Sequence, residues 1–170
     1  MRVEHEYERR GAVAYLAAWD VHRGQAIGRC EDTTGIEPFE RLVAQVMTSE
    51  PYASADRVFW IVDNGSSHRG QASIDRMTKA WPTAHLVHTP VHASWLNQCE
   101  IYFSVIQRKV VSPNDFLDTD QIRDRLAAFE ARYNPIATPF GWKFTRRDLR
   151  NLLQRIDDHQ PQDDEHPLAA

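Results

Sequence analysis

The sequence predicts an α/β domain with a mixed sheet, and three observations support this prediction. Residues 12–31 read as a β-hairpin, since two strand-like runs flank the turn His22-Arg23-Gly24. The wholly apolar run over residues 58–62 (VFWIV) is typical of a strand buried on both faces of a parallel sheet. Elsewhere, apolar residues recur at helical spacing. The order is therefore hairpin, helix, strand, helix, strand and further helices, which is an α/β layout.

The size and composition are those of an ordinary globular protein. The chain has 170 residues, of which 42% are hydrophobic and 26% charged, enough for one domain with a real core. We expect this domain to span residues 1–156, followed by an acidic, disordered tail over residues 157–170. The formal net charge of −4 gives no global basic field, so nucleic-acid binding would depend on metal ions or a local basic patch.

The cysteines and the hydropathy of the chain indicate the kind of cellular compartment in which the protein is expected. Cys30 and Cys99 have different surroundings and predict neither a disulfide framework nor a zinc knuckle. We expect both to be small buried residues in a reducing cytoplasm. We find no signal peptide and no apolar run of about 18 residues, so we expect no membrane span.

The elements of the first half follow from local signals. Residues 12–21 and 25–31 form the two hairpin strands. Pro38 suits the first turn of a helix. A helix over residues 71–80 and a strand over residues 85–87 follow the apolar run. The apolar face of the first helix consists of Phe39, Leu42, Val43, Val46 and Met47.

Three helices are predicted in the second half. Ser94 can cap a helix that runs to about residue 110. Another helix begins near Thr119 and is stopped by Asn134-Pro135, and a last one begins at Thr145. The expected core face of the Ser94 helix is Trp95, Cys99, Phe103 and Ile106. Its opposite, polar stripe is Asn97, Glu100, Ser104 and Gln107. The last helix is expected to bury Leu149, Leu152, Leu153 and Ile156.

Two carboxylates occupy positions that suit metal-dependent phosphodiester chemistry. Asp63 follows directly after the apolar strand, and Glu100 lies on the polar stripe of a helix. Mg²⁺ prefers such hard oxygen ligands, and two ions about 3.5–4 Å apart can activate a nucleophile and stabilise a leaving oxygen. The competing interpretations are a turn-forming Asp-Asn-Gly segment and a solvated helical Glu. We favour the ligand roles.

Polar neighbours of these carboxylates are candidates for supporting roles. His68 is equally consistent with contact to a scissile phosphate, orientation of Asp63 and capping of the loop. Asn64 and Asn97 are predicted to orient carboxylates or water.

A short-spaced histidine group is a weaker candidate for a metal site. His85, His88 and His92 lack helical spacing and a partner carboxylate, and Pro90 interrupts them. A catalytic zinc site uses a different arrangement, so we interpret the three as strand-end and loop residues.

Basic residues near the helix ends are candidates for contact with DNA phosphates, with a salt-dependent contribution. Each one taken singly is better explained as solvated surface. Arg108 and Lys109 share this character. The residues assigned to DNA as a group are Lys143, Arg146, Arg147 and Arg150.

Several phrases of the chain resemble the catalytic domain of DDE transposases in the mariner-related branch of bacterial insertion sequences. The resemblance covers roughly residues 4–150. It implies an RNase H-like fold that cuts DNA at element ends and joins them to a target, using Mg²⁺ or Mn²⁺. It also implies that Asp63 is the second acid of the catalytic triad and Glu100 the third. The phrases are residues 6–11 (EYERRG), Asp63-Asn64 with His68, Thr89-Pro90, residues 94–98 (SWLNQ) with Glu100, and residues 139–142 (PFGW).

The chain departs from the pattern of that family in one respect. The resemblance places the first catalytic Asp on a central strand before the EYERRG phrase, and a helix-turn-helix region further upstream. Here the phrase begins at residue 6. We therefore expect an N-terminally truncated domain that lacks the first central strand and is inactive alone. Asp20 is a possible substitute ligand, but a hairpin-end Asp that caps a turn with His22 and Gly24 is the favoured interpretation.

Three explanations of this departure stay open: a truncated remnant, a misassigned start, or the downstream product of a split reading frame. In the last case an upstream polypeptide supplies the strand and the helix-turn-helix. Three functions compete accordingly. The first is an incomplete transposase catalytic domain, the second a non-catalytic DNA-binding or assembly remnant, and the third a stand-alone RNase H-like nuclease using Asp20. We expect DNA as a partner and a cytoplasmic, nucleoid-associated location. The resemblance also implies self-association.

Overall fold

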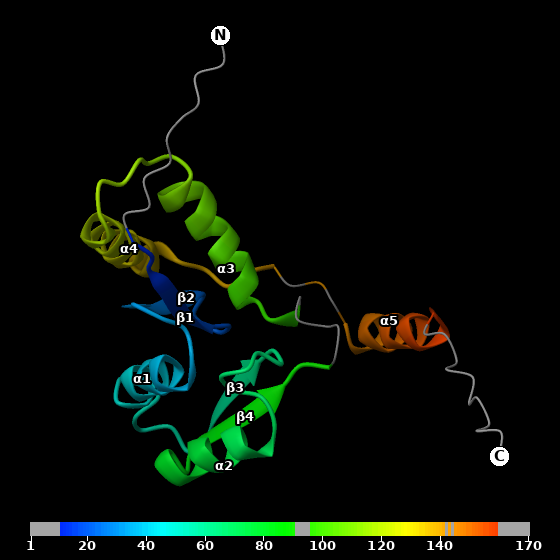
Figure 1. Cartoon of the computed structure of the whole chain (residues 1–170). Coiled ribbons are helices and arrows are strands. Elements are labelled where there is room, and N and C mark those ends of the chain that lie inside the picture. Colours follow the sequence, from blue (N-terminus) through cyan, green and yellow to red (C-terminus); the bar gives the residue numbers. More distant parts are fainter. Residues whose placement is uncertain (1–10, 91–95, 142, 144, 160–170) are drawn as a thin grey trace, which may run out of the picture. The chain divides into compact units, whose positions relative to one another are not determined.

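The computed structural model describes residues 11–90, 96–141, 143 and 145–159, and it confirms the α/β class (Figure 1). The chain forms two compact units, Met1–Pro139 and Phe140–Ala170. The first unit carries the strands. Instead of one mixed sheet, the described residues form two separate two-stranded sheets. Among the described residues, no strand hydrogen-bonds to both sheets.

The first sheet is an antiparallel hairpin. Its strands are β1 (Ala14–Asp20) and β2 (Gln25–Glu31), paired in a register that sets Asp20 opposite Gln25. The turn between them closes when the N–H of Gly24 donates to the carbonyl of Asp20 at 2.8 Å. Gly24 has φ 69°, in the left-handed region that glycine adopts without steric cost. The hairpin prediction is confirmed.

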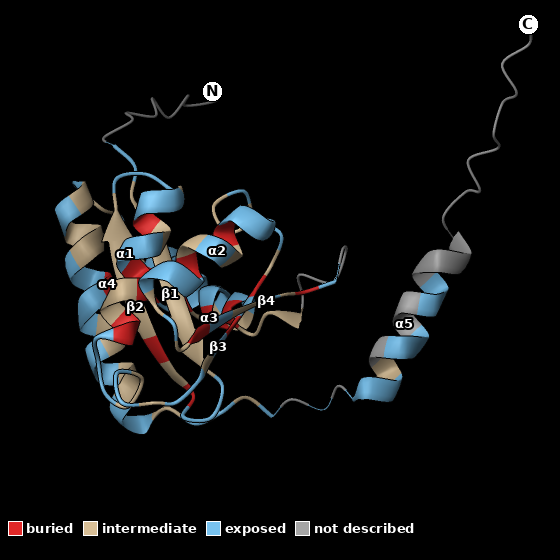
Figure 2. Cartoon of the chain, turned by 90° about the horizontal axis from the view of Figure 1, so that it is seen from below, coloured by how far each residue is buried: buried red, intermediate tan, exposed pale blue. Residues whose placement is uncertain are grey.

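Helix α1 (Ile36–Met47) is the centre of the hydrophobic core. Pro38 lies in its first turn, where its missing N–H costs no hydrogen bond. The apolar side of α1 packs on β1 and β2 and also joins the core around Trp60. Buried residues lie where helices meet strands, while the outward sides of the helices are exposed (Figure 2). The core cluster consists of Val43, Val46, Met47, Trp60, Met77 and Ala84.

The second sheet pairs β3 (Val58–Val62) and β4 (Ala84–His88) in parallel, connected through α2 (Gln71–Ala80). Only one of its faces is buried. Trp60 and Val62 point into the core, whereas Phe59 is 62% exposed and Ile61 52% exposed. The prediction that residues 58–62 are buried on both faces is therefore wrong. The core of α1 and α2 lies against one face, and the described residues leave the other uncovered.

Helix α3 (Cys99–Ile106) continues directly into a π-helical turn, η2 (Gln107–Val111). Cys99 and Ile106 are buried as predicted, but Phe103 is not. Tyr102 is fully buried, whereas Phe103 is 37% exposed. Tyr102 takes this position because its ring stacks on Trp19 and its hydroxyl lies 3.2 Å from that of Tyr15. Ser94 and Trp95, the predicted cap and first core residue, lie outside the described residues.

The remaining helices agree with the predicted ranges. Asp118 caps α4 (Thr119–Tyr133) by accepting a hydrogen bond from the N–H of Gln121 at 2.9 Å. A 3₁₀ turn, η3 (Asn134–Ile136), follows. In the second unit, α5 (Arg146–His159) extends past residue 156. The predicted core side chains of α5 lie outside those described. Within the described residues, no helix is both long and apolar enough to cross a membrane.

Candidate functional site

Asp63 lies at the carboxyl end of β3, and its side chain organises the loop that follows. Its Oδ1 accepts two hydrogen bonds, from the N–H of Gly65 at 2.9 Å and from Nε2 of His68 at 2.6 Å. A carboxylate accepts only, so Nε2 of His68 carries the proton. Among the described residues, no hydrogen bond reaches Oδ2, and the side chain is 40% exposed. Asp63 therefore combines one fixed oxygen with one that is available to a ligand.

The surroundings of Asp63 favour its charged form. Partial burial works against ionisation, but the hydrogen bonds from His68 and the Gly65 N–H outweigh it and hold the pKa of Asp63 below its ordinary value. Asp63 is thus a carboxylate at neutral pH, the state that a hard cation requires.

Asn64 anchors this loop to the neighbouring strand. Its amide Nδ2 donates to the carbonyl of Thr89 at 3.0 Å, just after β4. The structure therefore shows Asn64 bound to the end of β4 and gives it no hydrogen bond with Asp63. Carboxyl ends of parallel strands meet at one edge of a sheet, the usual location of ligand sites in α/β folds.

Glu100 lies in the first turn of α3 and is exposed. Its carboxylate makes no hydrogen bond or ion pair within the described part of the chain. Asn97 supports this helix end, since its Oδ1 accepts from the N–H of Cys99 at 3.1 Å. Of the predicted polar stripe, Glu100 and Ser104 are exposed on α3 and Gln107 is exposed at the start of η2, whereas Asn97 precedes the helix and is half-buried.

Asp20 has a structural role in the hairpin turn. Its Oδ1 accepts from the N–H groups of His22 and Arg23 at 2.8 and 3.0 Å, and its Oδ2 accepts from the hydroxyl of Tyr52 at 2.6 Å. Burial works against ionisation, but these hydrogen bonds lower the pKa of Asp20. Both oxygens are already engaged, as expected of a turn-capping residue.

The donor chemistry of Asp63 and Glu100 fits Mg²⁺ or Mn²⁺ in kind but not in number. In residues 11–90, 96–141, 143 and 145–159, no three Asp, Glu, His or Cys side chains gather closely enough to hold a metal ion. His85 packs its ring on Phe59, and His88 bonds a backbone carbonyl, while His92 lies outside the described residues. Further ligands would have to come from water, from DNA phosphates or from another carboxylate.

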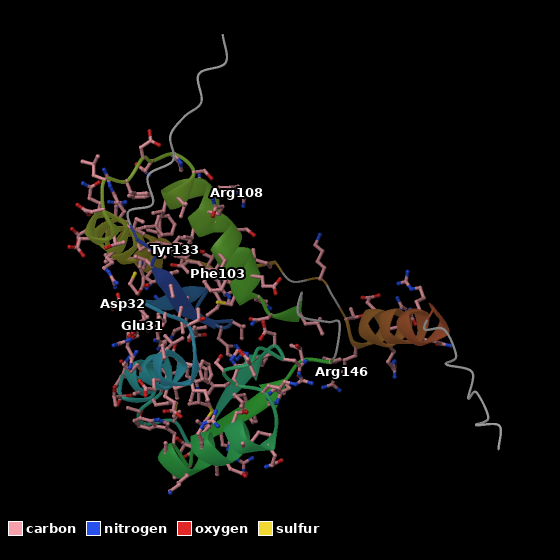
Figure 3. All side chains as sticks on the ribbon, in the orientation of Figure 1. Glu31, Asp32, Phe103, Arg108, Tyr133 and Arg146 are labelled. Atoms are coloured by element: carbon pink, nitrogen blue, oxygen red, sulfur yellow. The ribbon has the colours of Figure 1, made fainter. Side chains whose placement is uncertain are left out.

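The basic residues assigned to DNA all lie in the second unit and are exposed. They surround the start of α5, which Asp148 caps by accepting from the N–H and hydroxyl of Thr145 at 2.9 and 2.7 Å. Arg146 opens this helix, and Arg108 lies in η2 of the first unit, after α3 (Figure 3). The four residues are Lys143, Arg146, Arg147 and Arg150.

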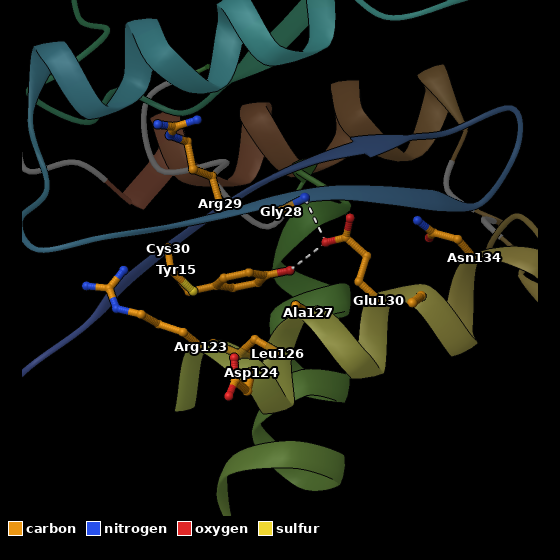
Figure 4. A pocket seen from close by; sticks show the side chains of 11 residues that line it. Tyr15, Gly28, Arg29, Cys30, Arg123, Asp124, Leu126, Ala127, Glu130 and Asn134 are labelled. Atoms are coloured by element: carbon orange, nitrogen blue, oxygen red, sulfur yellow. Dashed lines mark hydrogen bonds between the residues drawn. The ribbon is translucent and has the colours of Figure 1, made fainter. Parts of the chain in front are cut away.

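A cavity of about 430 Å³ lies between β2 and α4 (Figure 4), and Asp63 is not among its lining residues. At its wall, Glu130 accepts from the N–H of Gly28 at 2.8 Å and from the hydroxyl of Tyr15 at 3.2 Å. Burial raises the pKa of Glu130, although both hydrogen bonds oppose this rise. The sequence does not single out Glu130, because its partners lie more than a hundred residues away along the chain.

Comparison with known proteins adds one finding. A family model described as DDE superfamily endonuclease matches residues 1–123, well over half of the 170-residue chain. The match includes both sheets, Asp63, Glu100 and the start of α4. No curated protein matches the chain.

Proposed function

The chain belongs to the DDE superfamily endonucleases, and we propose that it is the catalytic part of a bacterial DNA transposase of the mariner-related branch of insertion sequences. The observation that carries this proposal is Asp63, an ionised carboxylate at the end of β3 with one oxygen fixed by His68 and the other available. Its position at the carboxyl edge of a parallel strand pair is where an α/β fold binds its ligand.

We propose that Asp63 and Glu100 hold Mg²⁺ or Mn²⁺, which when bound supplies charge stabilisation and an activated nucleophile for phosphodiester cleavage. Asp63 offers Oδ2, while the imidazole of His68 keeps Oδ1 in place. Glu100 offers a solvent-facing carboxylate at the start of α3, where Oδ1 of Asn97 accepts a hydrogen bond from the N–H of Cys99. On this proposal Asp63 and Glu100 are the two carboxylate ligands, and water, DNA phosphates or a further carboxylate complete the coordination.

The free strand edges support a proposal about assembly. Within the described residues, β1 pairs only with β2 and β3 only with β4. Unpaired edges are templates for another strand. We propose that a strand carrying the first catalytic Asp completes a single RNase H-like sheet, and that an upstream-frame polypeptide supplies it together with a helix-turn-helix. Self-association of the completed enzyme is part of the same proposal.

DNA is the proposed partner, in the cytoplasm at the nucleoid. Exposed cations at Lys143, Arg146, Arg147 and Arg150 are suited to phosphate contacts, and such contacts weaken steeply with added salt. A stand-alone nuclease that uses Asp20 receives no support from the geometry, because both oxygens of Asp20 are engaged in the turn and on Tyr52.

The test is cleavage of supercoiled plasmid DNA in Mn²⁺ and in Mg²⁺. We expect no cleavage by the chain alone, cleavage after addition of the upstream-frame polypeptide, and loss of it in Asp63→Asn and Glu100→Gln. Glu37→Gln is the matched control, since Glu37 is also an exposed glutamate in the first turn of a helix. Cleavage by the chain alone would favour the stand-alone nuclease. No cleavage under either condition would favour the non-catalytic remnant.

A further inference from the structure

The loop that follows β3 is held by a histidine from the neighbouring strand, which the proposed chemistry does not use. Nε2 of His88, at the end of β4, lies 2.6 Å from the backbone carbonyl of His68. A carbonyl only accepts hydrogen bonds, so Nε2 of His88 is the donor and carries a proton. Nε2 of His88 is therefore engaged by the backbone and is not available to a metal ion.

The side chain of His68 is itself confined by three contacts. Its Nε2 lies 2.6 Å from Oδ1 of Asp63 and its Nδ1 3.0 Å from the hydroxyl of Ser67. Its ring packs against Phe39 with the centroids 5.0 Å apart. The position of the imidazole therefore depends on where the backbone of residue 68 is held.

Two donors hold that backbone carbonyl, and they differ in origin. Ser73 lies in α2, on the same stretch of chain as His68. Its hydroxyl has one proton and lies 2.6 Å from the carbonyl of His68 and 2.7 Å from that of Gly70, so the hydrogen bond is shared between the two carbonyls. His88 comes from β4, whose register with β3 sets it opposite Val62. Of these two donors, only His88 ties the backbone carbonyl of residue 68 to the strand pair that carries Asp63.

We propose that His88 is a positioning residue of the Asp63 site: it anchors the backbone of His68 so that the imidazole of His68 fixes one carboxylate oxygen and leaves the other to a ligand. The functional meaning rests on the role proposed above for Asp63. The positioning itself rests on the hydrogen bonds alone. Hydrogen bonds thus connect β4 to Asp63 through His88 and His68. Loss of the bond from His88 therefore loosens the bond between His68 and Asp63.

The test is NMR of the metal-free chain with ¹⁵N-labelled histidine side chains. Its readout is the Nε2–H proton of His68, protected from exchange by Asp63 and assigned by its loss in His68→Ala. We expect this signal to disappear in His88→Ala and to persist in His88→Gln, whose amide N–H reaches the same carbonyl. His85→Ala is the matched control on the same strand, and it retains the signal. If His88→Ala does not fold, His88→Met replaces it as an apolar variant of similar reach.

A His68 signal that survives in His88→Ala, or that is absent from the wild type, overturns the proposal. Mn²⁺ binding, measured by electron paramagnetic resonance, distinguishes a failure of this proposal from a failure of the proposed function. Loss of a supporting residue typically weakens metal binding about 10- to 100-fold, and for a more remote residue we expect about 3- to 10-fold in His88→Ala. The same substitution in a His68→Ala background adds no further loss. A wild type that does not bind Mn²⁺ refutes the metal role of Asp63, while the NMR result still decides the role of His88.

Discussion

Gly28 of β2 lies in direct contact with Glu130 of α4, and its replacement by alanine tests the packing of the first unit. A Cβ atom at this position would overlap the hydroxyl of Tyr15 and the carboxylate of Glu130. The same carboxylate accepts the N–H of Gly28 at 2.8 Å and the hydroxyl of Tyr15 at 3.2 Å. Room for the methyl group therefore exists only if both hydrogen bonds are displaced.

The expected cost combines two effects. Forcing an extra methyl group into a packed site costs about 1–3 kcal/mol. A hydrogen bond to a charged group contributes about 1.5–3 kcal/mol, of which part is regained from water at this half-buried position. We expect Gly28→Ala to lower the free energy of unfolding by about 2–4 kcal/mol.

Urea unfolding followed by tryptophan fluorescence measures this loss. With a slope of about 2 kcal/mol per M, the midpoint should fall by about 1–2 M. Gly141→Ala is the control, since no atom of the described residues lies within 4 Å of its added Cβ, and its midpoint should not move. A Gly28→Ala midpoint equal to that of the wild type would refute the close approach of β2 and α4.

Three other predictions concern the site, the buried carboxyl and the second sheet. Gly65→Ala places a methyl group 3.0 Å from Nε2 of His68, so the protected imidazole proton should vanish from the NMR spectrum, and a retained signal contradicts the loop geometry. Glu130 has a raised pKa because it is buried, so the native state binds its proton more tightly than the unfolded state does. The contribution of Glu130 to the free energy of unfolding is therefore present at low pH and is lost as pH rises through the raised pKa. Urea midpoints from pH 4 to 8 should show this loss in the wild type and not in Glu130→Gln. By the same assay, Trp60→Ala should lower the free energy of unfolding by about 3–5 kcal/mol, whereas Ile61→Ser, at an exposed position, should lower it by at most about 0.5 kcal/mol. Equal losses would contradict the burial of β3 on one face only.

Local signals in the sequence predict most of the elements. The second hairpin strand and α2 have their predicted ends because a turn and a helical repeat are encoded within a few residues. The capping role of Asp20 is predictable for the same reason, since its turn partners lie two and three residues away.

Burial and long-range contacts are not predictable in this way. The run VFWIV is apolar on both sides, so only its coverage by α1 and α2 decides that Phe59 is exposed and Trp60 buried. On α3, adjacent aromatic residues compete for the core, and the hydroxyl of Tyr15 decides for Tyr102 over Phe103.

The candidate site likewise contains one feature that local sequence predicts and one that it does not. The position of Asp63 after an apolar strand is a local signal, and it identifies the carboxylate. The bond between His88 and the carbonyl of His68 joins residues twenty apart through the pairing of β3 with β4. No spacing rule in the sequence predicts that contact, and the histidine spacing identifies His88 only as a strand-end residue.

The measurement that tests the central claim most directly is a Mn²⁺ titration of the chain by electron paramagnetic resonance. Weak binding should be present in the wild type, be lost in Asp63→Asn and in Glu100→Gln, and persist in Glu37→Gln. Binding that is unchanged in both Asp63→Asn and Glu100→Gln would contradict the assignment of these two carboxylates as metal ligands.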